Sequence, residues 1–221
     1  RDGGGSWEEL PIGVADPCPI GIARTTSLIV DTRDHNKIWA GIEVDGVYKS
    51  LDGGDSWVHL PDLGDNVFQG DIHGMAQVPG RATYATSPFG LATTLDEGES
   101  WDYHYFPKHH EEDGFSYCRS MVVKADDPDV MFVANGDGIP GTTGALLRTQ
   151  DGGRNWEAVS LPVEPNSVIY GMGTHAERPD TIVAASLYGY LYASDDGGDS
   201  WRKLPKEFGE VRAVAVAPSA E

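Results

Sequence analysis

Five segments of the chain begin with a polar residue that is followed by a run of mostly small and apolar residues. The polar positions coincide when TTSLIV, IHGMAQV, CRSMVVKA, IYGMGTHA and VRAVAVAP are aligned. We call these positions the inner column; they are Thr26, His73, Arg119, Tyr170 and Arg212. Arginine can hold a carboxylate through paired hydrogen bonds, and histidine and tyrosine can transfer protons or orient a ligand. Two interpretations follow: a ligand site, or a polar, water-filled channel without chemistry.

A second group of polar residues lies in the loops expected after the next strands. Asn135 and Tyr188 are candidate ligand-binding residues of this group. Glu43 and Asp137, together with Tyr170, are candidate catalytic residues, because two carboxylates across a cleft can hydrolyse a glycosidic bond. The loop around Asp137, NGDGIPGTTG, is long, and such insertions often carry function. Plain surface decoration is the alternative.

The connection FPKHHEEDGFSY, residues 106–117, contains several possible metal ligands. His109, His110 and Glu111 would form a divalent-metal site with His73 if the loop folds toward the inner column. The spacing of these residues is not diagnostic of a metal site. A charged, exposed loop is the alternative, and the fold itself requires no cofactor.

These residues must be positioned by repeated elements, because the chain contains an internal repeat. The pattern occurs as SLDGGDSW at 50–57, TLDEGESW at 94–101, TQDGGRNW at 149–156 and SDDGGDSW at 194–201, with a shortened DGGGSW at 2–7. Five copies of one short pattern indicate a repeat architecture. The aspartates are Asp2, Asp52, Asp96, Asp151 and Asp196, and the tryptophans are Trp7, Trp57, Trp101, Trp156 and Trp201.

The repeated motif resembles the Asp box, S/T-x-D-x-G-x-S/T-W, of the BNR-repeat β-propellers. That superfamily includes sialidases, sortilin-type receptors, xyloglucan-acting glycosidases and photosystem assembly factors. The resemblance implies that each box joins the third and fourth strands of a blade, on the outer rim and away from the usual ligand site. It implies structural roles for the box residues and is nearly silent on activity. One copy departs from the pattern, with Asn155 in place of Ser or Thr.

Four stretches of alternating apolar and polar residues surround each complete motif, as expected for four antiparallel strands. The sequence therefore predicts an all-β fold, a single β-propeller domain of four-stranded blades with Asp-box turns. The four complete blades are expected at about 25–61, 71–107, 116–162 and 168–205. Since propeller ligands usually bind at the mouth of the central channel, the inner column is expected to gather there.

The two ends of the chain are expected to form partial blades, at 1–11 and 210–221. SWEELP is expected as a lone outer strand and VRAVAVAP as a lone inner strand. Unpaired strand edges attract other strands. The chain is therefore expected to be part of a ring of six or seven blades, with the missing blades or a second copy of the chain supplying the other strands. A five-bladed ring with one thin blade is the alternative.

Composition excludes several classes of function. Lys and Arg number 16 against 35 Asp and Glu, for a net charge of −19. This acidic balance argues against nucleic acid and anionic membrane surfaces as partners. No apolar run is long enough for a membrane helix, and the first residues do not resemble a signal peptide, so a soluble protein is expected. Cys18 and Cys118 can form one bridge or remain two thiols.

The sequence leaves three functions open. The first is a propeller that binds a small polar or anionic ligand, or a partner segment, at the channel mouth. The second is a glycoside hydrolase-like enzyme acting on a carbohydrate or another small polar substrate. The third is a metal-dependent enzyme using histidines that face the channel.

Overall fold

The computed structural model describes residues 3–15, 22–112 and 114–218 of the chain. Within these ranges it consists of β-strands and one 3-10 helix, η1 (Val67–Gly70). The strands form four antiparallel sheets of four strands, each paired in chain order. This confirms the predicted all-β architecture of four-stranded antiparallel blades. No helix in the described ranges is long and apolar enough to cross a membrane.

Each sheet contains one copy of the repeat. The first sheet consists of β1 (Thr25–Val30), β2 (Ile38–Ile42), β3 (Gly46–Ser50) and β4 (Val58–His59). The second consists of β5 (Gly74–Val78), β6 (Ala82–Ser87), β7 (Gly90–Thr94) and β8 (Asp102–Tyr105). The third consists of β9 (Ser120–Val123), β10 (Met131–Gly136), β11 (Gly144–Thr149) and β12 (Glu157–Ala158). The fourth consists of β13 (Ile169–His175), β14 (Arg178–Ser186), β15 (Leu191–Ser194) and β16 (Arg202–Lys203).

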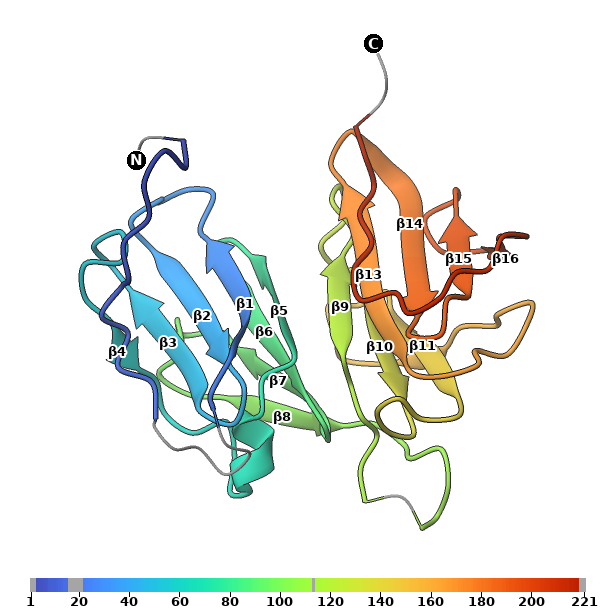
Figure 1. Ribbon diagram of the computed structural model, residues 1–221, viewed down its shortest axis with the longest axis horizontal. Helices are drawn as coiled ribbons and strands as arrows, with labels where there is room; N and C mark the ends of the chain where they lie inside the picture. Colours follow the sequence, from blue (N-terminus) through green and yellow to red (C-terminus); the bar gives the residue numbers. More distant parts are fainter. Residues whose placement is uncertain (1–2, 16–21, 113, 219–221) are drawn as a thin grey trace.

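The first strands of the four sheets lie next to one another. β1 contacts β5, β5 contacts β9, and β9 contacts β13. The other strands of each sheet extend outward from this row, so that the sheets are arranged like blades along an arc (Figure 1). Residues at the starts of the first strands are therefore brought close together although some 45–50 residues of chain separate each from the next.

The turn between the third and fourth strands of each blade is organised by one carboxylate. In the second blade, Asp96 accepts hydrogen bonds from the Ser100 backbone N–H at 3.0 Å and the Ser100 hydroxyl at 2.6 Å. The Thr94 hydroxyl donates a third at 2.8 Å and accepts one from the Gly98 N–H. Gly98 has φ +93°, and a Cβ there would lie 2.6 Å from a methyl group of Leu60, so both backbone and packing require glycine. We call these four turns, at 50–57, 94–101, 149–156 and 194–201, the repeat turns.

The turn with the altered sequence keeps this geometry. Asn155 donates its backbone N–H to Asp151 at 2.9 Å and its side-chain amide to the same carboxylate at 2.6 Å. The amide thus replaces the Ser hydroxyl, because both groups can donate to the carboxylate from this position. The aspartate of the fifth motif, Asp2, lies outside the described residues.

The tryptophans that end the repeat turns pack into the hydrophobic cores between blades. Trp101 packs on the core formed by the first and second blades, Trp156 on that of the second and third, and Trp201 on that of the third and fourth. Trp57 packs on a smaller cluster of the first blade with Ile12 and others from the N-terminal segment. Each repeat turn therefore fixes its own hairpin and, through its Trp, attaches its blade to a neighbouring layer.

The two end segments differ from expectation, since neither SWEELP nor VRAVAVAP forms a strand in the described residues. Trp7 is 91% exposed. The C-terminal segment lies along β13, where the Cα of Ala213 is 3.5 Å from the place that a Cβ of residue 171 would occupy. A strand needs a neighbouring ladder of backbone hydrogen bonds, and neither segment has one here. That other strands cover these ends stays a prediction.

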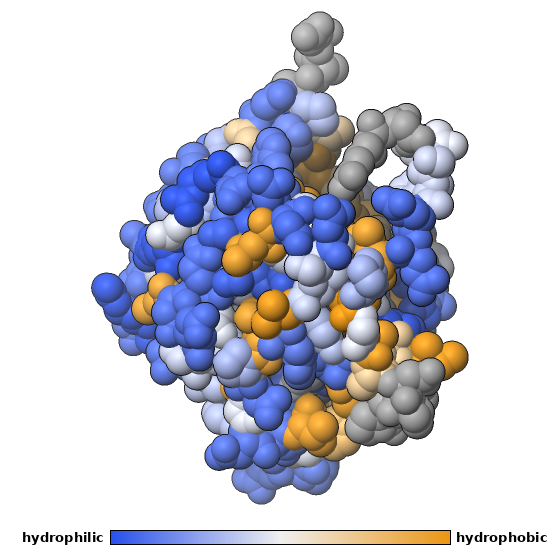
Figure 2. All heavy atoms as spheres, turned by 90° about the vertical axis from the view of Figure 1, so that its left-hand side faces the viewer, coloured by the Kyte–Doolittle hydropathy of each residue, from blue (hydrophilic) through white to orange (hydrophobic). Residues whose placement is uncertain are grey.

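The face on the left of Figure 1 carries few hydrophobic side chains. Figure 2 shows it as mostly hydrophilic, with hydrophobic residues in small, separate patches. Leu51 and Val58 are each 64% exposed. Scattered single hydrophobic residues are normal on a protein surface. This face therefore gives no sign of an extensive apolar interface.

The carboxylates of the repeat turns are expected to make the fold sensitive to acid. Hydrogen bonds from Ser100 lower the pKa of Asp96 from its ordinary 3.8 to about 2. A carboxyl with a lowered pKa in the folded state contributes stability that is present above about pH 4 and is lost as the pH falls toward 2. Asp96→Asn is expected to unfold at lower urea concentration than the unmodified protein near neutral pH, with the difference shrinking between pH 4 and 2.

Asp62, which is exposed and outside the repeat turns, provides the matched control. Urea unfolding across this pH range should show almost no effect of Asp62→Asn. A stability difference for Asp96→Asn that is independent of pH, or no difference at all, would contradict the role given to the turn carboxylate.

Candidate functional site

The five residues of the inner column line one cavity of about 290 Å³. Thr26 lies in β1 and Tyr170 in β13, while His73 and Arg119 directly precede β5 and β9. Arg212 reaches the cavity from the C-terminal segment beside β13. Backbone hydrogen bonds hold two of these positions, from His73 N–H to Thr86 O and from Arg119 N–H to Ala134 O. The Thr26 hydroxyl donates to the carbonyl oxygen of Ile72, which joins the first two blades at the cavity.

Two guanidinium groups share the ring of Tyr170. Arg119 Nη2 donates a 2.6 Å hydrogen bond to Tyr170 Oη, and its Cζ lies 4.4 Å from the ring centroid. Arg212 Cζ lies 5.7 Å from the same centroid. Arg212 also pairs with Glu210, whose hydrogen bond raises the pKa of Arg212. Arg119 is half-buried, whereas Arg212 is exposed and paired with Glu210.

His73 is buried in the wall of the cavity, and polar groups lie near both of its ring nitrogens. Nδ1 lies 2.7 Å from the carbonyl oxygen of Cys118, and Nε2 lies 3.4 Å from a carboxylate oxygen of Asp71. A ring nitrogen this close to a carbonyl must carry the proton, so Nδ1 is a donor and is not available to a metal. The ring also packs on Tyr117, with centroids 4.7 Å apart. His73 is therefore an oriented wall residue.

Sequence reasoning missed Asp71 and Tyr117. The other carboxylate oxygen of Asp71, Oδ1, is buried without a hydrogen-bond partner in the structure. Burial raises the pKa of Tyr117 to about 12; the charge of Arg119 opposes this shift, and Asp71, Tyr170 and Glu43 add smaller contributions that raise the pKa. Tyr117 is thus a neutral phenol. The i, i+2 spacing in DIH, which places Asp71 and His73 on one side of an extended chain, is the signal that could have identified the carboxylate.

The two carboxylates predicted as a catalytic pair have separate structural partners, and neither lines the cavity. Glu43 forms an ion pair with Arg24. Asp137 accepts hydrogen bonds from Thr142 and Thr143 of its own loop. Burial acts to raise the pKa of Asp137, but these hydrogen bonds outweigh it and leave the pKa below its ordinary value. Asp137 is therefore an ionised loop-stabilising group and is poorly suited to donate a proton.

The other loop candidates also lie outside the cavity lining. Asn135 is buried and donates its amide to the Ser116 hydroxyl at 3.0 Å. His109 contacts the Asn135 side-chain oxygen at 3.2 Å, and His110 lies 3.7 Å from the Asp137 carboxylate. His109 and His110 thus lie against the end of β10 and the residue that follows it. Tyr188 is 49% exposed in the turn after β14.

The predicted metal ligands are distributed over different contacts. The described part of the chain brings together no group of three or more His, Cys, Asp or Glu side chains that could hold a metal ion. Glu111 is exposed. Cys118 is buried, and burial raises the pKa of its thiol to about 12. Its candidate disulfide partner, Cys18, lies outside the described residues.

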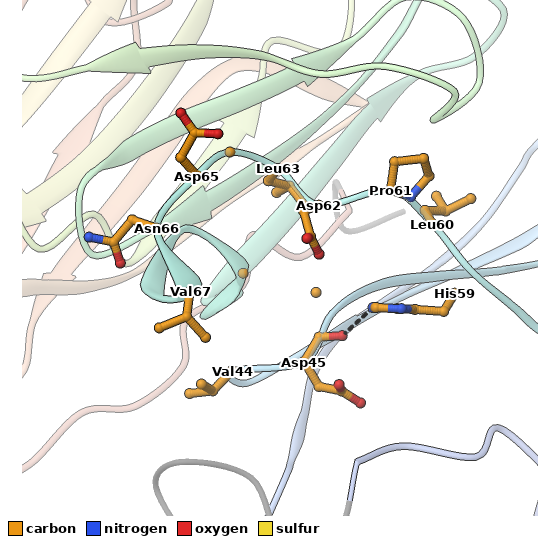
Figure 3. A pocket seen from close by; sticks show the side chains of 13 residues that line it. Val44, Asp45, His59, Leu60, Pro61, Asp62, Leu63, Asp65, Asn66 and Val67 are labelled. Carbon is orange, nitrogen blue, oxygen red and sulfur yellow. Dashed lines mark hydrogen bonds between the residues drawn. The ribbon is translucent and has the colours of Figure 1, made fainter.

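A second cavity, of about 310 Å³, lies between the β2–β3 turn and the segment that leads into η1 (Figure 3). Three carboxylates, from Asp45, Asp62 and Asp65, line it. His59 contacts the carbonyl oxygen of Asp45 at 3.0 Å, shown by the dashed line in Figure 3. Like charges at close range repel. An anionic ligand is therefore expected at the arginine-lined cavity and not at this one.

Comparison with known proteins shows the fold. No protein-family model and no curated protein matches the sequence. An ancestral GH74 enzyme matches with a TM-score of 0.68 and 20% identity, over 90% of this chain and 26% of the enzyme. YCF48 from Cyanidioschyzon merolae matches with a TM-score of 0.61 and 14% identity, over 94% of this chain and 62% of YCF48. The structure of YCF48 bound to D1 peptide matches with a TM-score of 0.54 and 20% identity, over 91% of this chain and 59% of that chain.

These structures and the four sheets define the chain as a β-propeller with four-stranded antiparallel blades. The chain spans 26% of the GH74 enzyme and less than two thirds of YCF48. At these identities the likeness concerns the fold, and function must be argued from the site.

The contact between Arg119 and Tyr170 gives a stability prediction. Tyr170→Phe keeps the ring but removes the hydroxyl that accepts from Arg119, and is expected to lower the free energy of unfolding by about 1 kcal/mol. Tyr170→Ala also removes the ring under both guanidinium groups and is expected to cost about 2–4 kcal/mol. Urea unfolding measures both values. Tyr188→Phe, at an exposed tyrosine, is the control, and a Tyr170→Phe protein as stable as the unmodified one would contradict the contact.

Proposed function

We propose that this chain is part of an Asp-box β-propeller that binds a small polar or anionic ligand, or a segment of a partner protein, at the mouth of its central channel. The repeat turns are the Asp boxes. The inner column supplies the binding groups: Arg119 and Arg212 hold the anion, and His73 and Tyr170 orient it. The proposal includes no nucleic acid and no membrane partner.

One observation carries the proposal. Side chains from all four blades and from the C-terminal segment line the same cavity. Two guanidinium groups lie there next to one aromatic ring, that of Tyr170. A pair of cations is unusual on a protein with a net charge of −19. Guanidinium groups make strong charge-assisted hydrogen bonds to an anion, and concave sites favour ligand binding. The fold likeness to YCF48 bound to D1 peptide supports a partner segment as one form of the ligand.

The second candidate is a glycoside hydrolase-like enzyme. The fold likeness to GH74 enzymes favours it. Glu43 and Asp71 are its carboxylates, and Asp71 lies 3.4 Å from Nε2 of His73 in the inner column. Asp71 takes the place of Asp137 in this candidate, because Asp137 is engaged by its own loop. A carbohydrate would then be the substrate.

The binding proposal is tested with citrate and propionate as anionic probes. The double variant Arg119→Ala/Arg212→Ala is expected to bind both at least about tenfold more weakly than the unmodified protein in isothermal titration calorimetry, because both charge-assisted contacts are lost. It is also expected to lose their protection against thermal unfolding. The matched control is Arg81→Ala/Arg202→Ala, which changes the net charge equally but removes arginines paired with Asp129 and Asp195.

If both double variants bind the probes equally weakly, the loss of affinity comes from the change in net charge and the proposal is contradicted. Absence of binding by the unmodified protein would also contradict it. Turnover of aryl glycosides by the unmodified protein, lost in Glu43→Gln or Asp71→Asn, would favour the enzyme instead.

A further inference from the structure

A row of aromatic rings leads from the loops at the channel mouth to the cavity of the inner column. Phe89 contacts Phe115 edge-on with ring centroids 6.4 Å apart, Phe115 contacts Tyr117 at 5.6 Å, and Tyr117 contacts His73 at 4.7 Å. We call Phe89, Phe115 and Tyr117 the aromatic row. Its last contact, His73, is itself a wall of the cavity.

The aromatic row is built at the same end of the blades as the cavity. Phe89 lies in the tight turn between β6 and β7, and Phe115 and Tyr117 lie just before β9. The three rings are only partly buried, whereas core rings such as Tyr84 and Phe132 are 2% and 0% exposed. None of the three lines the cavity itself, and the row reaches it through His73. Partly exposed rings beside a polar cavity can pack on a planar apolar group.

The charges near the row indicate which polar group the ligand would carry next to its ring. Arg119 is close to both features: it donates to Tyr170 in the cavity, and it lies two residues after Tyr117, whose ring packs on His73 of the cavity wall. A ligand whose carboxylate binds Arg119 can therefore extend toward the row. Tyr117 remains neutral, so the row itself does not repel an anion.

Resting on the proposed function, we propose that the ligand is an amphipathic carboxylate, whose carboxylate binds Arg119 and Arg212 and whose aromatic ring packs on Phe89, Phe115 and Tyr117. The row then selects among anions, while the arginines supply the attraction common to all of them.

The proposal is tested with three probes: propionate, 3-phenylpropionate and 3-phenylpropylamine. Calorimetric titration of the unmodified protein is expected to show 3-phenylpropionate binding at least about tenfold more tightly than propionate, because the ring adds apolar contact area. The amine, which has the same ring with the opposite charge, is expected not to bind. In Phe115→Ala the preference for the phenyl compound over propionate is expected to fall toward unity.

Phe115→Leu keeps most of the apolar volume and serves as a second variant in case Phe115→Ala does not fold. It is expected to reduce the preference for 3-phenylpropionate partly. Trp7→Ala removes an exposed aromatic side chain outside the row and is the matched control. Equal affinity for the two carboxylates, or a preference that survives in Phe115→Ala, would overturn this inference while leaving the anion site intact. Binding of the amine would also overturn this inference, because the ring would then be recognised without the negative charge. Failure of the unmodified protein to bind either carboxylate would instead overturn the proposed function.

Discussion

The fold depends on a carboxylate that accepts hydrogen bonds within its own turn. In each repeat turn the aspartate binds the backbone N–H and the side chain of the residue four positions later, and a Ser or Thr hydroxyl donates to it from two positions before. These contacts close the hairpin at the outer edge of the blade and aim the following Trp at the hydrophobic core. Local hydrogen bonding and packing between blades are therefore coupled, because the residue that ends the turn also fills the adjacent layer.

Regular packing of the blades determines what happens at their inner edge. When successive sheets stack through equivalent residues, equivalent positions of their first strands meet around the centre. The inner column is such a set, and its polar side chains converge on one cavity although the blades differ in sequence. The repeat turns lie at the opposite edge of each blade from this cavity. The cavity also gathers two arginines on a strongly acidic protein, with Glu210 paired to Arg212 and Asp71 next to His73.

Those features that depend on the repeat were predictable from the sequence, and those that depend on individual loops were not. The blades and the shared cavity of Thr26, His73 and Arg119 follow from periodicity and alignment, which act on every repeat alike. The neighbours of His73 do not, because Asp71 and Tyr117 occupy the equivalent position of successive blades, two residues before the inner column, and the residue type at that position differs from blade to blade. The hydrogen-bond partners of the loop carboxylates and the conformation of the chain ends also did not follow from the sequence, for related reasons. Asp137 was expected at a catalytic site, but hydrogen bonds from its own loop engage it, and such turns depend on exact backbone geometry. SWEELP and VRAVAVAP have strand-like patterns, but a pattern yields a strand only where a neighbour supplies the backbone partners.

The central claim is that an anion binds at the cavity through Arg119 and Arg212. The most direct measurement is a titration of the arginine Nε–Hε signals with citrate, followed by two-dimensional ¹H–¹⁵N NMR and assigned with single Arg→Lys variants. The account predicts saturable shifts of the Arg119 and Arg212 signals with a common dissociation constant, while the signals of Arg81 and Arg202 stay in place. Shifts of similar size at all the arginines, or none at Arg119, would contradict it.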